Sequence, residues 1–193
     1  IAYDEQAVLE FALGDVSKCF GPLYEPWRTR MVQRNPNGDL QLLTRVREVR
    51  GKRYDFSEPA SLIAEYDVPA DAWFLRDNIT GPLPYSALME IALQPCGFLG
   101  AWMGSYHLLP ELDLHFRNLD GNARVLALPA VAGKTIETHV TLEKMTRSGA
   151  TIIEHFRFSL LCEGVPFYEG TTVFGYFTAE ALAQQNRVPT QDE

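Results

Sequence analysis

The chain has 193 residues, of which 46% are hydrophobic, and a formal net charge of −8. This length fits one domain, or one domain with an arm, and the apolar content is sufficient for a sizeable core. The acidic charge balance argues against nucleic acid as a partner, because phosphate binding needs clustered Lys and Arg. No apolar run reaches the ~20 residues that span a bilayer, so we expect no membrane partner.

The cysteine pattern argues against a disulfide framework or a metal site. Cys19, Cys96 and Cys162 are far apart in the sequence, odd in number and without metal-binding spacing. Such isolated cysteines are typical of reduced thiols in a cytoplasmic protein. No signal peptide is visible, and because the chain begins with Ile1 we expect it to be processed or to be a piece of a longer protein. We therefore expect a cytoplasmic location, with no metal and no cofactor.

The first part of the chain is predicted to contain one helix and two strands. Apolar side chains recur at helical spacing over Tyr3–Phe20, which predicts a single helix. Leu40–Arg50 and Ala60–Val68 have the composition and alternation of strands. Trp73–Pro84 contains Asn, Gly and Pro residues that interrupt regular structure, so we expect an irregular segment there.

A long apolar segment, Pro84–Gly104, is predicted to form one helix. It is apolar on nearly all sides and must therefore be covered on nearly all sides. Pro95 removes one backbone hydrogen bond inside the helix, and we expect a kink near Ile91.

The second half of the chain is predicted to be mostly strands joined by tight turns. We interpret the Asp120-Gly121 pair as a hairpin turn. The last residues, 179–193, are polar and are predicted to form a short helix and a frayed tail. The predicted strands are Leu112–Leu119, Ala123–Leu128, Thr135–Met145, Thr151–Cys162 and Val165–Phe177.

A curved antiparallel sheet wrapped around one long central helix meets these requirements, which makes the fold class α+β. We divide the chain into an N-terminal arm of helix and loop (residues 1–39), a main domain (residues 40–178) and a C-terminal tail (residues 179–193). Such a sheet leaves an edge strand exposed, and this favours edge-to-edge pairing with a second copy.

Glu90 and Gln94 are the candidate functional side chains of the long helix. They are four positions apart and share one helix face, which Gly97 and Ala101 continue as a shallow groove. A carboxylate in so apolar a helix is costly unless it is paired or used. The alternative is a solvated Glu90 near the start of the helix, since unusual acids mark functional sites only statistically.

The segment of residues 71–100 resembles the active-site segment of a known family. In this family a strand end carrying Asp-x-Trp-Phe is followed by a loop containing Pro, and then by a helix with a D/E-x-x-x-Q/H motif and a Gly-Phe pair. The order matches that of β-hydroxyacyl-ACP dehydratases of the bacterial β-hydroxydecanoyl type, where ACP is acyl carrier protein. The matching residues are Asp71–Phe74, Glu90–Gln94 and Gly97-Phe98.

The resemblance covers about residues 40 to 178 and implies a hotdog fold. In particular, the chain is similar to dehydratase regions of polyunsaturated fatty acid synthases and related iterative polyketide synthases. There, helices like Met89–Phe98 and an RNLDG-like sequence, here Arg117–Gly121, recur. The partners that the resemblance implies are an ACP-bound acyl thioester and a second hotdog domain.

The same resemblance implies roles for individual residues. Glu90 would be the acid that protonates the leaving hydroxyl group, and Gln94 would orient it or bind water. The amides of Tyr85 and Ser86, at the helix start, would hold the thioester carbonyl. Gly97 is expected to contact substrate in the groove beyond Gln94.

One departure from the family pattern affects the catalytic base. The family has a catalytic His a few residues after the Trp-Phe pair, whereas this chain has Asn78 there, or Arg76 in an ungapped alignment from the helix. We expect Asn78 to lie at the substrate in place of the imidazole. The histidines of this chain are elsewhere in the sequence, at His107, His115, His139 and His155.

The sequence therefore predicts one hotdog half of a 3-hydroxyacyl-ACP dehydratase, whose histidine comes from a partner hotdog. Two alternatives stay open at this point. The chain could be a non-catalytic hotdog that supports its neighbour and shapes the acyl tunnel, which the loss of the His favours. It could also be a hotdog acyl thioesterase, because some such enzymes use a helix carboxylate without His to activate water.

Overall fold

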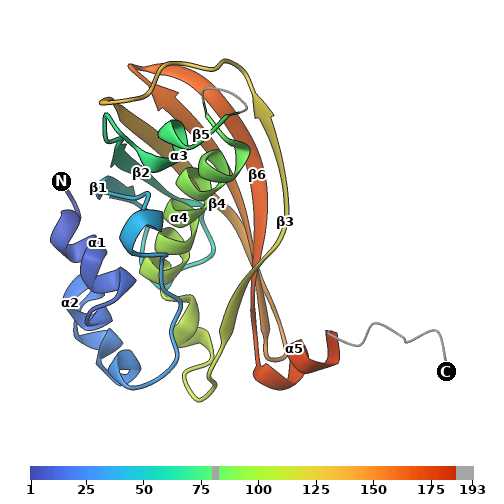
Figure 1. Cartoon of the computed structure of the whole chain (residues 1–193). Coiled ribbons are helices and arrows are strands. Elements are labelled where there is room, and N and C mark those ends of the chain that lie inside the picture. The colour runs from blue at the N-terminus through green and yellow to red at the C-terminus, as the bar shows by residue number, and fades with distance from the viewer. Residues whose placement is uncertain (80–82, 186–193) are drawn as a thin grey trace, which may run out of the picture.

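The computed structural model describes residues 1–79 and 83–185. Within these residues, one antiparallel six-stranded sheet in the order β1-β2-β4-β5-β6-β3 wraps around the long helix α4 (Figure 1). This is the α+β architecture predicted from the sequence. The strands are β1 (Arg45–Arg50), β2 (Ala60–Asp67), β3 (His115–Val125), β4 (Thr135–Ser148), β5 (Thr151–Cys162) and β6 (Val165–Phe177).

Helix α4 (Tyr85–Met103) begins after Pro84 and ends at Gly104, which adopts a left-handed conformation with φ 88°. This confirms the predicted long helix, including both ends. Pro95 lacks the N–H that would bond the Ile91 carbonyl. The Thr138 hydroxyl of β4 donates to that carbonyl oxygen at 3.5 Å instead. No helix in the described part of the chain is long and apolar enough to cross a membrane.

The strands sort their side chains between the helix and the outer face of the sheet. On β5, Ile152, Phe156 and Phe158 are buried toward α4, and the alternate positions, among them His155 and Arg157, lie on the outer face. The same alternation runs through β4. The core therefore lies between the concave face of the sheet and α4.

The N-terminal arm contains two helices, and the prediction of one helix over Tyr3–Phe20 is wrong. Asp15 starts the second helix because its carboxylate accepts a hydrogen bond from the amide two residues later at 3.0 Å. The elements of the arm are α1 (Glu5–Ala12), α2 (Val16–Phe20) and the short 3-10 helices η1 (Pro22–Arg28) and η2 (Gly38–Leu40).

The arm packs into the same hydrophobic core as the rest of the chain. The Phe20 ring lies 5.1 Å from the Phe11 ring and 5.0 Å from the Phe98 ring of α4, both in edge-to-face contact. Helices α1 and α2 lie on the side of α4 away from β3 and β6 (Figure 1). The sheet and the arm together enclose α4.

The prediction of a hairpin turn at Asp120-Gly121 is wrong. These residues belong to one continuous strand, His115–Val125, which pairs with β6 along its length. The pairing register shifts between Asn118 and Asp120, so the local irregularity is a β-bulge and not a turn. Long-range pairing with β6 overrides the local turn propensity.

Three other segments differ from the prediction or extend beyond the described residues. The first strand begins at Arg45 and not at Leu40, because residues 40–42 bond to α4. The segment predicted to be irregular contains a short helix, α3 (Trp73–Arg76), and its residues 80–82 lie outside the described part. In the tail, α5 (Ala179–Gln185) is the expected short helix, and residues 186–193 are outside the description.

Candidate functional site

Glu90 and Gln94 lie one turn apart on α4 and are hydrogen-bonded. Gln94 Nε2 donates to Glu90 Oε2 at 3.1 Å. Glu90 is half-buried, whereas Gln94 is only 3% exposed. The spacing in the sequence thus brings these two side chains together, as expected for positions four apart on a helix.

The Gln94 amide is held from its other side by residues 40–42. Nε2 also donates to the Leu40 carbonyl at 2.7 Å, and Oε1 accepts from the Leu42 N–H at 2.9 Å. These partners fix which end of the amide carries the N–H groups, and the second Nε2 proton is directed to Glu90. Of the two roles expected for Gln94, orienting Glu90 therefore fits better than binding water.

The first turn of α4 is open to solvent beside Glu90. The N-cap residue Pro84 provides no side-chain hydrogen bond to the first amides of the helix, which have no intrahelical partner either. Tyr85 is 63% exposed, and Ser86 is exposed as well. The Tyr85 and Ser86 amides are thus placed where a ligand carbonyl could reach them, and this role stays a prediction.

Tyr168 of β6 lies next to this first turn. Its hydroxyl donates to Met89 Sδ at 3.0 Å. Burial, with Tyr85 close by, raises the pKa of Tyr168 to about 12, so its phenol is protonated at neutral pH. Tyr168 pairs with Val125 at the end of β3. The start of α4 therefore lies one strand away from the edge of the sheet.

The Asp-x-Trp-Phe segment precedes this opening and contacts the arm. Phe74 is buried in the core, and Trp73 Nε1 donates to the Asp39 carbonyl at 2.8 Å. Asn78, at the expected His position, is half-buried and lies two residues after α3. Its proposed contact with substrate stays a prediction.

The groove expected at Gly97 and Ala101 is occupied by the arm. Gln33 Nε2 donates to the Gly97 carbonyl, and the Tyr24 hydroxyl donates to the Ala101 carbonyl. A Cβ added at Gly97 would lie 3.5 Å from Asn35 Oδ1. Gly97 could thus contact substrate only if the arm moved.

The four histidines lie away from the start of α4. His139 and His155 are on the outer face of the sheet, and His115 begins β3. His107 packs against the Trp27 ring at 4.5 Å, and burial lowers its pKa. Among the described residues, no group of three or more His, Cys, Asp or Glu side chains could hold a metal ion.

A buried carboxyl group, that of Glu154 of β5, was not predicted from the sequence. It is 0% exposed and faces α4, where Ser105 and Tyr176 donate hydrogen bonds to it. Burial raises its pKa to about 7. The signal in the sequence was an acid at an inward position of a strand, between Ile152 and Phe156.

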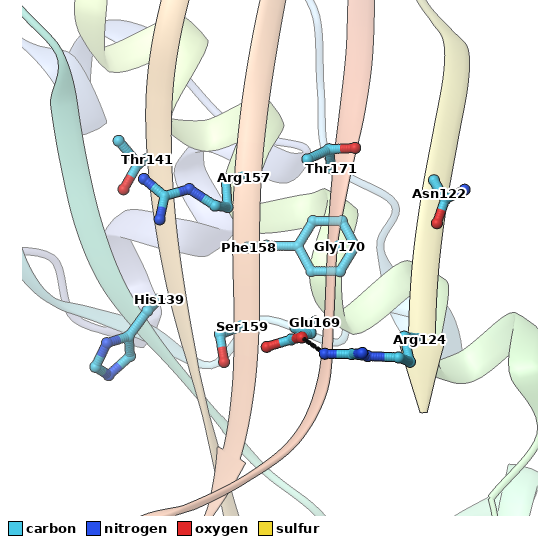
Figure 2. A pocket seen from close by; sticks show the side chains of 10 residues that line it. All are labelled: Asn122, Arg124, His139, Thr141, Arg157, Phe158, Ser159, Glu169, Gly170 and Thr171. Carbon is cyan, nitrogen blue, oxygen red and sulfur yellow. Dashed lines mark hydrogen bonds and ion pairs between the residues drawn. The ribbon is translucent and has the colours of Figure 1, made fainter. Parts of the chain in front are cut away.

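A hollow of 740 Å³ lies on the outer face of the sheet, over β3 to β6 (Figure 2). Its polar walls include His139 and Ser159, which are cross-strand neighbours. Its charged side chains are paired, Arg124 with Glu169 at 2.5 Å and Arg157 with Glu143 at 2.7 Å. This hollow is on the opposite side of the sheet from α4, and Glu90 does not line it.

The chain is similar in sequence to one known protein and in structure to others. No family model matches the chain. The chain is 37% identical over 185 residues to one of the subunits of a polyunsaturated fatty acid synthase from Thraustochytrium sp., covering 91% of this chain and 12% of the relative. The dehydratase heterocomplex ApeI:P of Xenorhabdus doucetiae matches in structure, with TM-score 0.56 and 19% identity over 79% of this chain and 94% of that chain.

The chain has the hotdog fold. The hotdog fold implied by the predicted resemblance is confirmed, and the expected similarity to a polyunsaturated fatty acid synthase is present in the sequence. The hotdog domain spans about an eighth of the length of its synthase relative.

Proposed function

We propose that this hotdog domain is one half of a 3-hydroxyacyl-ACP dehydratase in a polyunsaturated fatty acid synthase or a related polyketide synthase. The observation that carries the proposal is the Glu90–Gln94 pair at the open start of an otherwise enclosed helix. The likeness to part of a polyunsaturated fatty acid synthase over 91% of the chain supports the setting.

In the proposed reaction, a base removes the α-proton of an ACP-bound 3-hydroxyacyl thioester, and an acid protonates the β-hydroxyl group. The electrons of the C–H bond form the new double bond while the C–O bond breaks, and water leaves. Glu90 is the acid, and Gln94 orients its carboxyl group. The thioester carbonyl gains negative charge in the transition state, where the Tyr85 and Ser86 amides hold it.

The base in this proposal comes from a second hotdog. Asn78 has no basic nitrogen that could accept the α-proton, and the histidines of the chain lie away from Glu90. We infer that the partner supplies an imidazole. The structural neighbour from Xenorhabdus doucetiae is itself called a heterocomplex, which supports a partner of different sequence.

The edge strand β3 is where we place this partner. The other edge, β1, already has a bridging partner within the chain, because Tyr3 forms a β-bridge with Val46. By contrast, β3 is exposed along most of its length and is followed by more exposed aliphatic residues. A partner strand on β3 would reach the first turn of α4 through Val125 and Tyr168. The exposed aliphatic residues are Leu119, Val125, Leu126 and Leu128.

The test is substitution of the proposed acid in the assembled pair. With a His-bearing partner hotdog, the domain should hydrate crotonyl-pantetheine, the reverse of dehydration. Glu90→Gln keeps the side-chain volume but removes the ionisable group, so kcat should fall by about 10²–10⁴-fold, the usual contribution of a general acid. Glu143→Gln, on the outer face of the sheet, is the matched control and should leave kcat unchanged.

Two other results would select the alternatives. Full activity of the Glu90→Gln pair would make this hotdog a non-catalytic support for its partner. Steady hydrolysis of acyl-pantetheine by the isolated domain, lost in Glu90→Ala, would identify a thioesterase.

A further inference from the structure

Two distant sequence motifs of the hotdog domain meet on one short stretch of chain, where the arm joins the main domain. We call this stretch, residues 39–42, the strap. The Asp39 carbonyl accepts a hydrogen bond from Trp73 Nε1 at 2.8 Å. The strap also bonds to both polar atoms of the Gln94 amide. The Leu40 carbonyl accepts from Nε2 at 2.7 Å, and the Leu42 N–H donates to Oε1 at 2.9 Å.

These hydrogen bonds form a continuous path from Trp73 to Glu90. Trp73 holds the strap, the strap holds Gln94, and Gln94 Nε2 donates to Glu90 Oε2 at 3.1 Å. Gln94 is 3% exposed and the Leu42 side chain is 2% exposed. The bond between Leu42 and Gln94 is therefore shielded from water, where hydrogen bonds fix geometry most strongly, and the bonds of Gln94 to Leu40 and Glu90 are partly buried.

The outer side of the strap is open. It borders a hollow of 510 Å³ whose walls include Gly38, Asp39 and Gln41. Gly38, which precedes the strap, has φ 61°, a left-handed conformation that glycine adopts readily and other residues do not. The strap is held against α4 by its bonds to Trp73 and Gln94 together with the buried Leu42 side chain.

We propose that the strap and Trp73 are positioning elements for Glu90. They do not touch the substrate but act through Gln94, whose amide they hold in the orientation that directs a proton to the Glu90 carboxyl group. The proposal rests on the proposed function of Glu90. It assigns a role to residues 39–42 and to the indole N–H of Trp73, both outside the helix that carries the site.

The first experiment compares two Trp→Phe substitutions in the pair with a His-bearing partner. Trp73→Phe removes the N–H that bonds Asp39, and kcat for crotonyl-pantetheine hydration should fall about five-fold, the effect of one lost hydrogen bond, with KM unchanged. Trp27→Phe is the control, because Trp27 Nε1 is buried without a hydrogen-bond partner, and it should leave kcat unchanged. An unchanged kcat in Trp73→Phe would overturn the proposal.

The second measurement needs no activity and uses the hotdog domain alone. Amide hydrogen exchange at Leu42, whose N–H bonds to Gln94 Oε1, should become several-fold faster in Trp73→Phe. Exchange at Leu99, inside α4, should stay the same. Unchanged Leu42 exchange would overturn the link between Trp73 and Gln94. If the wild-type pair is inactive while Leu42 exchange responds, the proposed function fails but the link stands.

A second variant covers the case in which Trp73→Phe folds poorly. Gly38→Ala disturbs the strap from its other end. A Cβ there has nothing within 4 Å, so the effect comes only from the left-handed backbone conformation. It should also lower kcat and accelerate Leu42 exchange. A normal kcat with faster Leu42 exchange would contradict a positioning role.

Discussion

The Tyr176 hydroxyl donates a hydrogen bond to Glu154 Oε2 at 3.1 Å, in the closed space between β5, β6 and α4. The Ser105 hydroxyl donates to the other carboxyl oxygen. Gly100 of α4 makes room for the acid, since a Cβ there would lie 2.6 Å from Glu154 Oε2. Burial raises the pKa of Glu154 to about 7 even though both hydrogen bonds act to lower it.

This pKa predicts a pH-dependent stability. The ordinary pKa is 4.5 and the folded value about 7, so the folded chain holds the proton more tightly between these values. The stabilisation is fully present below pH 4.5 and is lost as the pH rises through about 7. The loss amounts to about 3 kcal/mol, at 1.36 kcal/mol per pKa unit.

Urea unfolding of wild type and Glu154→Gln at pH 5 and pH 8 checks this prediction. Gln is neutral at both pH values, so the variant should gain stability relative to wild type by about 2–3 kcal/mol between them. If the difference in unfolding free energy between wild type and Glu154→Gln is the same at both pH values, Glu154 does not have a raised pKa.

Gln94 is predicted to contribute to stability as well as to the site. Gln94→Leu leaves the Leu40 carbonyl and the Leu42 N–H without their partner. The free energy of unfolding should fall by about 2–4 kcal/mol, since each unsatisfied buried group costs about 1–3 kcal/mol. Gln41→Leu is the control, because that side chain borders a hollow, and it should change stability by less than about 0.5 kcal/mol. Equal effects of the two substitutions would contradict the role of Gln94.

The arm is predicted to be required for the fold of the hotdog domain. Phe20→Ala removes ring contacts with Phe11 and Phe98. It should lower the free energy of unfolding by about 3–5 kcal/mol, the usual cost for a buried Phe. Leu13→Ala, at a position that is 56% exposed, should cost far less. Chemical denaturation of both variants measures this, and a small effect of Phe20→Ala would show that the arm is dispensable.

The β3 edge is predicted to bind the partner hotdog. Leu119→Lys places a charge on this exposed edge and should weaken the pair at least about ten-fold, because edge lysines oppose strand pairing. The melting temperature of the isolated domain should not change. Sedimentation of mixtures measures the affinity, with Leu13→Lys on the arm as the control. Unchanged affinity in Leu119→Lys would place the partner elsewhere.

The sequence predicts the elements whose signals are local. The apolar run of α4 and the alternation of β5 and β6 are sufficient to identify them, and the Glu90–Gln94 contact follows from helix geometry alone. The continuous strand through Asp120-Gly121 could not be predicted, because pairing with β6 decides it.

Contacts between residues far apart in the sequence could not be predicted from the sequence either. Nothing near Gln94 in the sequence indicates that its amide bonds to Leu40 and Leu42, which lie more than fifty residues away. The small residues Gly97 and Ala101 likewise predicted a shallow groove on this helix face, and in the structure Gln33 occupies it at Gly97. In both cases the partner lies in the segment from Gln33 to Leu42, whose path over α4 depends on tertiary packing.

In the proposed mechanism Glu90 acts on a substrate that is shared with the partner hotdog, and titration of the partner with the domain measures this dependence. Wild-type domain added to a fixed amount of His-bearing partner should raise crotonyl-pantetheine hydration until the two are equimolar. Glu90→Gln should bind the partner equally well, give almost no hydration, and inhibit the wild-type pair by displacement. If the Glu90→Gln domain restores the same activity as wild type, Glu90 is not the acid of the reaction.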